Sequence, residues 1–305
     1  MITIPPYLQK GDTIAITCPA GFMLLEKAKE CIKKLKLEGY KVLVSKTVGG
    51  KSKNYFSGTD DERTGEFQQY LDDDNVKAIL CGRGGYGTGR IIDKLNFKKF
   101  IQNPKWIIGF SDITILHSHI VTNFKIATMH APMAAAFGNA AHNPQNIVSL
   151  LSLLEGNTYE YITASHNFNK VGKAKGKLIG GNIALLANAI GTKSDIKTKN
   201  CILFIEDTGE QLYAVDRMLY QLKRSGKLKN LAALIVGDFT DIADTDRHFG
   251  KSIYEIINDI VDEYKYPVCY NFPVGHGVEN RALKVGVKHT LAVDEESGIL
   301  KECYE

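Results

Sequence analysis

The sequence has no Cys-x-x-Cys pair, and its six cysteines are scattered over 305 residues. Closely spaced cysteine pairs mark zinc sites and redox motifs, whereas a disulfide framework belongs to an oxidising compartment. Several of these cysteines lie inside short apolar runs, which is typical of buried and reduced thiols. We therefore expect neither disulfides nor a zinc site.

The chain also lacks a long hydrophobic run and a block of basic residues. No apolar segment approaches the roughly 18 residues of a membrane span, and residues 1–6 have neither the basic nor the apolar region of a signal peptide. The net charge of +4 is spread along the chain, unlike the concentrated basic patch of a nucleic-acid-binding surface. We expect a cytoplasmic protein that binds neither membranes nor nucleic acid.

The pattern of the first 150 residues is that of a parallel sheet covered by helices on both faces. Short apolar runs alternate there with segments of helical period. The expected strands are 13–17, 41–45, 76–81 and 106–110, and the expected helices are 24–37, 59–71, 89–95 and 113–124. This alternation predicts an α/β fold.

A polar, glycine-containing stretch from 155 to 177 is typical of a linker. We place a domain boundary near residue 165, which gives a domain of residues 1–165 and a smaller one of residues 166–305. The second half is expected to mix strands 201–205 and 231–236 with helices 183–190, 213–225 and 252–263, followed by strand-like segments. It is predicted to be a smaller α/β or β-rich domain.

The most informative segment is Gly109-Phe110-Ser111-Asp112, where an apolar strand runs into Gly-x-Ser and then into a helix. This is the geometry of a nucleophile elbow, in which a sharp turn exposes the serine hydroxyl. The amino end of the helix would stabilise an oxyanion beside Ser111. The motif lacks the second glycine, because Ile113 stands at that position, and a merely tight turn is the alternative.

A second strand end carries Gly82, Gly84 and Gly87 in the spacing G-x-G-x-x-G, which also occurs in dinucleotide-binding folds. The strand is not the first of the chain, and no acidic strand end follows at about 20 residues, as a ribose site would require. The other interpretation is a turn whose backbone N–H groups approach an oxyanion or carboxylate. In that case Arg83 and Tyr86 are candidate substrate contacts.

A serine nucleophile needs a general base, and His276 is the best candidate because two flanking glycines allow an exposed, tightly turned backbone. An ordinary loop histidine is the alternative. His117 and His119 lie on the helix after the nucleophile and cannot fold back onto it, and a structural role is expected for His130.

An orienting carboxylate is expected at the end of a strand. Glu206 closes the apolar run 201–205, where an unpaired acid would be costly. Capping of the next helix accounts for Asp207 and Thr208 but leaves Glu206 without a role. Asp238, which follows another apolar strand, is the second choice.

Six segments, taken in order, resemble the LD-carboxypeptidase family of serine peptidases, also called muramoyltetrapeptide carboxypeptidases. They are GDTIA at 11–15 leading to PAG at 19–21, CGRGGYG at 81–87, GFSD at 109–112, GGN at 180–182, LFIED at 203–207 and PVGHG at 273–277. Each segment alone is weak, but six in order are specific.

The resemblance implies a catalytic triad of Ser111, Glu206 and His276. It also implies a flavodoxin-like parallel-sheet N-terminal domain that carries the nucleophile, and a smaller, swivelling β-rich α/β C-terminal domain that carries the glutamate and the histidine. The active site would then lie between the domains of a homodimer.

On this resemblance we expect release of the terminal D-alanine from a cytoplasmic murein tetrapeptide in cell-wall recycling, without metal or organic cofactor. Backbone N–H groups of Asp112, Gly84 and Gly85 would form the oxyanion hole. Arg83, with Arg281 behind it, would bind the carboxylate of the substrate.

Two alternatives remain. Some members of the superfamily resemble self-immunity hydrolases that cleave the peptidyl- or aminoacyl-nucleotide of processed microcin C with the same triad. An aromatic platform would favour that reaction, but the single tryptophan, Trp106, lies outside the region between Glu206 and His276. The other alternative is a non-catalytic protein that binds a nucleotide or a peptide through the glycine-rich loop.

Overall fold

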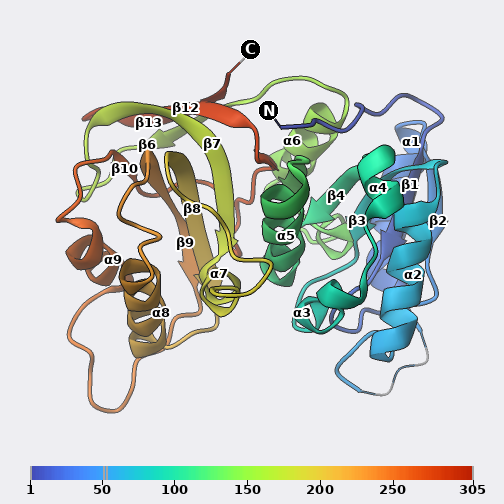
Figure 1. Ribbon diagram of the computed structural model, residues 1–305, viewed down its shortest axis with the longest axis horizontal. Coiled ribbons are helices and arrows are strands. Elements are labelled where there is room, and N and C mark those ends of the chain that lie inside the picture. Colours follow the sequence, from blue (N-terminus) through green and yellow to red (C-terminus); the bar gives the residue numbers. More distant parts are fainter. Residues whose placement is uncertain (1, 51, 53, 304–305) are drawn as a thin grey trace.

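The structure is a computed structural model, and it describes residues 2–50, 52 and 54–303. Two sheets lie side by side, with helix α5 (Thr114–Phe124) between them (Figure 1). The first sheet has six strands in the order β11-β5-β4-β3-β1-β2, and the second has seven in the order β10-β9-β8-β7-β12-β13-β6.

Five strands of the first sheet are parallel and follow the flavodoxin-like order β2-β1-β3-β4-β5. They are β1 (Thr13–Thr17), β2 (Lys41–Val44), β3 (Val76–Cys81), β4 (Trp106–Gly109) and β5 (Thr128–His130), and β11 (Leu283–Val285) is the antiparallel edge strand. The four strands predicted in this half are confirmed to within one residue. The carboxyl ends of β1, β3 and β4 therefore share one rim.

Helices cover both faces of this sheet, as the sequence predicted. Alternate strand residues face opposite sides: Ile14 and Ile16 pack with one core cluster, whereas Ala15 packs with the other. The first cluster lies under α1 (Lys29–Leu37) and α6 (Gln145–Leu154), and the second under α2 (Asp60–Asp72), α4 (Lys98–Gln102) and α5. The predicted helix 89–95 is a short α3 (Thr88–Ile91) followed by a 3₁₀ turn.

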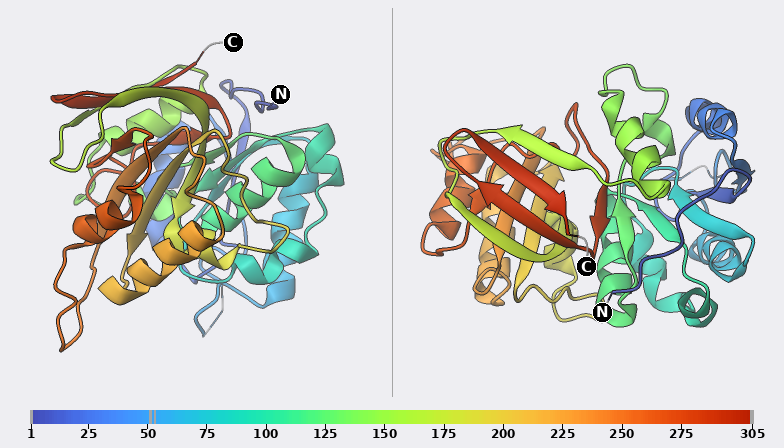
Figure 2. Two further views of the ribbon diagram at one scale, coloured as in Figure 1. Left: turned by 60° about the vertical axis from the view of Figure 1, so that its left-hand side comes forward. Right: turned by 90° about the horizontal axis from the view of Figure 1, so that it is seen from above.

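The second sheet combines a parallel and an antiparallel part. Its strands are β6 (Glu160–Ala164), β7 (Gly172–Asn182), β8 (Cys201–Thr208), β9 (Ala233–Thr240), β10 (Val268–Cys269), β12 (Lys288–Val293) and β13 (Ser297–Glu302). The helices are α7 (Ile183–Asn188), α8 (Leu212–Arg224) and α9 (Ile253–Val261), which contribute to its core. The segment between β9 and α9 projects from the body of the molecule (Figure 2).

The chain passes between the two sheets more than once. Strand β6 precedes residue 165 and pairs with β13 in the second sheet, whereas β11 returns to the first sheet beside β5. The boundary near residue 165 stays a prediction. The segment that joins β10 to β11 contains His276, so this histidine lies where the two sheets meet.

The described part of the chain contains no helix that is both long and apolar enough to cross a bilayer. The six cysteines are free thiols, and all except Cys303 are buried. Within the same residues, no three histidine, cysteine or acidic side chains are grouped to hold a metal ion.

Candidate active site

Ser111 lies directly beyond the carboxyl end of the buried strand β4 and opens a 3₁₀ turn (Ser111–Ile113) that leads into α5. Its φ is +60°, in the left-handed region that residues other than glycine adopt at a cost. Such strain is concentrated at functional sites, and a strained strand-to-helix turn is what exposes the serine of a nucleophile elbow. The side chain is half-buried at the rim of the sheet.

The glycine-rich loop, residues 82–87, is anchored to this turn by the side chain of Asp112. The carboxylate is buried and accepts a hydrogen bond from the backbone N–H of Thr88 at 2.8 Å. Burial raises the pKa of Asp112. From the sequence we predicted only a backbone role for Asp112. The one sequence feature that could have indicated that its side chain anchors the loop is its position directly after Ser111.

Gly84 passes so close to Ser111 that a side chain at Gly84 would crowd the serine. A Cβ atom at Gly84 would lie 3.0 Å from Ser111 Cβ, 3.1 Å from Ser111 Oγ and 3.5 Å from the backbone nitrogen of Asp112. The carbonyl oxygen of Gly84 accepts a hydrogen bond from the N–H of Gly21. The loop backbone thus lies beside the hydroxyl, and the oxyanion-hole role of Gly84, Gly85 and Asp112 stays a prediction.

If Ser111 is the reacting group, Gly84→Ala is expected to lower kcat/KM by about 10- to 100-fold, because a Cβ this close displaces the hydroxyl and a misplacement of about 1 Å costs on the order of 100-fold. The φ of Gly84 is not in the left-handed region, so its backbone accepts alanine and the thermal midpoint should change little. Gly89→Ala is the matched control, since its Cβ would meet nothing within 4 Å. Equal activities of the two variants would contradict the close approach.

His276 and Glu206 form a short polar contact in the site. His276 Nδ1 lies 2.7 Å from Glu206 Oε2, and the glutamate is fully buried at the end of β8. Burial opposes a charge on the imidazole, but the hydrogen bond and the charge of Glu206 outweigh it and raise the pKa of His276. A carboxylate on Nδ1 fixes the tautomer that leaves Nε2 free to accept a proton.

The imidazole of His276 also lies against Phe110, the residue that precedes Ser111. The ring centroids of Phe110 and His276 are 4.8 Å apart. In the described part of the chain, the hydrogen bonds of the imidazole join it to Glu206 and not to Ser111. Hydrogen bonds between nucleophile and base are often long without substrate and shorten in the complex.

Contacts between α5 and β7 bring the serine and the glutamate together. Thr114, at the start of α5, accepts a hydrogen bond from the backbone N–H of Asn182 at 3.0 Å. Gly181 makes this approach possible, because a Cβ there would lie 2.4 Å from Thr114 Oγ1. Asn182 is the register neighbour of Glu206, so the end of β8 is held beside the nucleophile turn.

Two further carboxylates surround the pair. Burial raises the pKa of Asp207 to about 6, and burial together with the charge of Glu206 raises the pKa of Asp238 to about 6. Asp238, the second choice for the orienting acid, lies nearby, but the carboxylate that accepts the hydrogen bond of His276 Nδ1 is that of Glu206. The three acids place negative charge around one imidazole.

The predicted capping role of Asp207 and Thr208 is wrong. Both residues belong to β8, which is longer than predicted, and Gln211 precedes the first residue of α8. Asp207 instead accepts hydrogen bonds from the Asn182 side chain and the N–H groups of Ala184 and Thr208. These contacts allow an acid to remain in a buried strand.

The predicted substrate contacts lie in different surroundings. Arg83 and Tyr86 are exposed on the glycine-rich loop, and Arg83 donates a hydrogen bond to the carbonyl of Phe22. Arg281 donates to Glu279 and to Tyr159. Their roles toward a substrate stay predictions.

The three histidines for which no catalytic role was expected, His117, His119 and His130, are buried. His117 donates from Nε2 to the carbonyl of Gly109, and His119 contacts Ser194. His130 ends β5 and packs edge-to-face on Phe204. These contacts agree with the structural roles that the sequence predicted for them.

The chain matches family models in both halves. The model of the LD-carboxypeptidase N-terminal domain matches residues 14–131, and that of the LD-carboxypeptidase C-terminal domain matches residues 175–291. The chain is 33% identical to a probable murein peptide carboxypeptidase of Bacillus subtilis (strain 168), over 97% of this chain and 94% of the relative.

Other relatives extend the comparison. The microcin C7 self-immunity protein MccF of Escherichia coli is 27% identical, over 97% of this chain and 95% of that protein. The crystal structure of muramoyltetrapeptide carboxypeptidase from Oxalobacter formigenes matches with a TM-score of 0.86 and 27% identity, over 96% of this chain and 99% of that one. Sequence and fold agree over nearly the whole length, and the chain therefore belongs to the LD-carboxypeptidase family, a family of serine-type hydrolases.

Proposed function

We propose that this protein is a serine carboxypeptidase that releases the terminal D-alanine from murein tetrapeptide. The observation that carries the proposal is the hydrogen-bonded pair of the half-buried His276 and the fully buried Glu206, 2.7 Å apart, beside a serine held in a strained turn. The names of the Bacillus subtilis and Oxalobacter formigenes relatives support the substrate class.

The proposed reaction is acyl transfer to water in two steps. Ser111 Oγ attacks the carbonyl carbon of the residue that precedes D-alanine, while His276 accepts the hydroxyl proton and Glu206 stabilises the imidazolium. Backbone N–H groups of Asp112 and of the glycine-rich loop stabilise the oxyanion. His276 then gives its proton to the departing amine, and a water molecule, deprotonated by the same imidazole, hydrolyses the acyl-enzyme.

The departing D-alanine carries a free carboxylate that needs a cation. We assign this role to Arg83 because its loop borders Ser111, with Tyr86 beside it on the same exposed turn. Arg281 is the second candidate. We further propose that the enzyme acts as a homodimer in the cytoplasm, without nucleic acid, on fragments of recycled cell wall; the resemblance to the family supports these assignments.

The relation to MccF makes a second reaction worth testing, namely cleavage of a peptidyl-nucleotide by the same triad. A tryptophan platform for a nucleobase is absent from the described residues of the site, because the single tryptophan, Trp106, is fully buried in β4, where it donates a hydrogen bond to the carbonyl of Pro6. Tyr86 on the glycine-rich loop is an exposed ring that a nucleobase could meet. The two substrates therefore have to be compared directly.

Mass spectrometry of D-alanine release from murein tetrapeptide tests the proposal, with a peptidyl-adenylate analogue as the second substrate. We expect release of D-alanine from the tetrapeptide and little cleavage of the adenylate. Cleavage of the adenylate alone would retain the triad and change the substrate. If neither substrate is turned over, a binding role for the glycine-rich loop becomes the better interpretation.

A further inference from the structure

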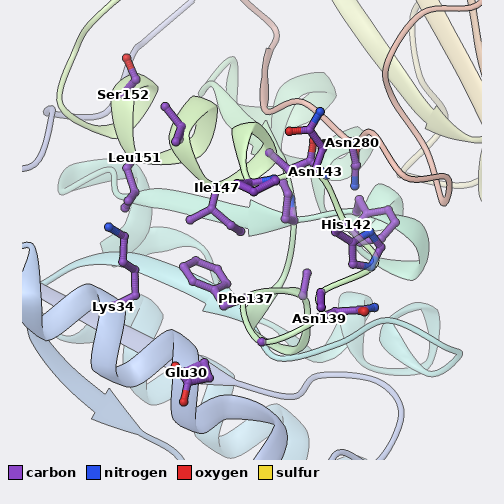
Figure 3. Close-up of a pocket in the computed structure, with 18 of the residues that line it drawn as sticks. Glu30, Lys34, Phe137, Asn139, His142, Asn143, Ile147, Leu151, Ser152 and Asn280 are labelled. Atoms are coloured by element: carbon purple, nitrogen blue, oxygen red, sulfur yellow. Dashed lines mark hydrogen bonds between the residues drawn. The ribbon is translucent and has the colours of Figure 1, made fainter.

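A groove of about 1080 Å³ opens beside His276 and extends between α6 and α1 (Figure 3). Its catalytic end is lined by Phe110, Gly275, His276 and Asn280, and Lys34 of α1 lines it as well. Sites for small organic ligands typically enclose about 300–1,000 Å³, so the groove has room for a substantial ligand. Nothing in the reaction itself uses this space.

The groove and the base are parts of one rigid unit. Asn280 is 4% exposed; its side-chain oxygen accepts a hydrogen bond from Gly275, and its backbone N–H donates to the side chain of Asn146 on α6. Asn146 in turn donates to the carbonyl of Val278. These bonds fix the loop that carries His276 to the wall of the groove, so a ligand in the groove has a defined position relative to the base.

The lining suits a peptide. Phe137, Ile147 and Leu151 are apolar and cover aliphatic parts of a ligand, whereas the amide nitrogen of Asn139 provides a donor for peptide groups. The amide of Asn143 is already bonded to Glu279 and Gln145. At the α1 end, Lys34 and Glu38 form an ion pair with N and O atoms 2.6 Å apart, so that end carries both signs of charge.

The glycine-rich loop does not contribute to the described lining of the groove. Residues 82–87, which border Ser111 and carry Arg83, are absent from its described lining. In the proposed reaction a single amino acid leaves on the carboxyl side of the scissile bond, and one D-alanine is far too small to need such a groove. The groove therefore remains for the part of the substrate that is transferred to the serine.

We propose that this groove is the binding site for the acyl side of the substrate, that is, for the peptide residues that precede the one whose carbonyl carbon is attacked. The proposal rests on the proposed carboxypeptidase function and adds a specificity site to it. The enzyme then selects its substrate by the length of the peptide on the amino side of the scissile bond.

The experiment uses a variant that closes the middle of the groove. Ile147 points from α6 toward Phe137 across the groove (Figure 3), and it is only half-buried, so Ile147→Trp fills the space between them. Gln145→Trp is the matched control, because Gln145 is exposed on the same helix and lies outside the described lining. Phe137→Ala is a second variant, which removes a ring from the opposite wall.

Two substrates are compared: the tetrapeptide, and an N-acetylated dipeptide made of its last two residues. We expect the tetrapeptide to have the higher kcat/KM in the unmodified enzyme, by about tenfold or more. Ile147→Trp should abolish this preference through KM while the dipeptide is hydrolysed as before, Phe137→Ala should reduce it, and Gln145→Trp should retain it. Equal losses on both substrates, or no preference in the unmodified enzyme, would overturn the proposal.

Calorimetric binding of the tripeptide left after D-alanine release separates this proposal from the proposed function. If the unmodified protein releases no D-alanine, the function fails, yet tripeptide binding that Ile147→Trp abolishes and Gln145→Trp preserves would still support the groove. If D-alanine is released but tripeptide affinity is the same in all variants, the groove assignment fails alone. Thermal unfolding of each variant verifies that it is folded.

Discussion

Ser111→Ala is expected to lower the turnover of murein tetrapeptide by about 10⁴- to 10⁶-fold while the fold stays intact. The substitution removes only the hydroxyl group, and in the proposed mechanism its oxygen is the nucleophile. The residual rate would come from the oxyanion hole and from substrate binding, which do not depend on the hydroxyl. Release of D-alanine measures the loss, and thermal unfolding measures the stability.

Two other substitutions sharpen this test. Ser118→Ala removes a buried hydroxyl of α5 that has no hydrogen-bond partner among the described residues, and it should leave turnover unchanged. Ser111→Gly removes the same nucleophile but also relieves the cost of φ +60°, so it should be as inactive as Ser111→Ala and slightly more stable. Near-normal turnover in a clean Ser111→Ala preparation would refute the mechanism.

Most of the first sheet was predictable from the sequence because its signal is local. Strands β1, β3 and β4 are short, wholly or largely apolar runs buried by helices on both faces, and turns or polar residues mark their ends. Strand β11 was not predictable: it has three residues, and its place beside β5 depends on a chain return from a distant segment. Such pairing leaves no periodic signal in the sequence.

The placement of the candidate side chains was predictable for a similar reason. In a parallel sheet, functional side chains gather at the carboxyl ends of strands; Ser111 lies just beyond the end of β4, and Glu206 lies two residues before the end of β8. The contacts that connect them were not predictable, because the bond of Asn182 to Thr114 spans 68 residues. The groove is similar, since α1 and α6 line it together although they are more than 100 residues apart in the sequence.

Glu206→Gln is expected to have the second largest effect, a fall in kcat of about 10⁴-fold. Glutamine has nearly the same shape, so the buried site stays filled, but its amide can donate to Nδ1 and favour the wrong imidazole tautomer. It also cannot stabilise the imidazolium that forms when His276 accepts the proton of Ser111. Release of D-alanine and thermal unfolding again measure activity and stability.

The pH dependence of the residual activity distinguishes this explanation from a simple loss of structure. The base must be neutral, so kcat/KM rises with pH through the pKa of His276, which Glu206 raises against the opposing effect of burial. Without that carboxylate, burial dominates and the pKa of His276 falls, so the acidic limb of the Glu206→Gln profile should lie at lower pH than in the unmodified enzyme.

Asp238→Asn is the matched control. It also removes a nearby charge but no hydrogen bond to the imidazole, and it should shift the acidic limb less and retain most of the turnover. A Glu206→Gln enzyme within tenfold of full activity, or a larger loss in Asp238→Asn, would assign the orienting role to another acid.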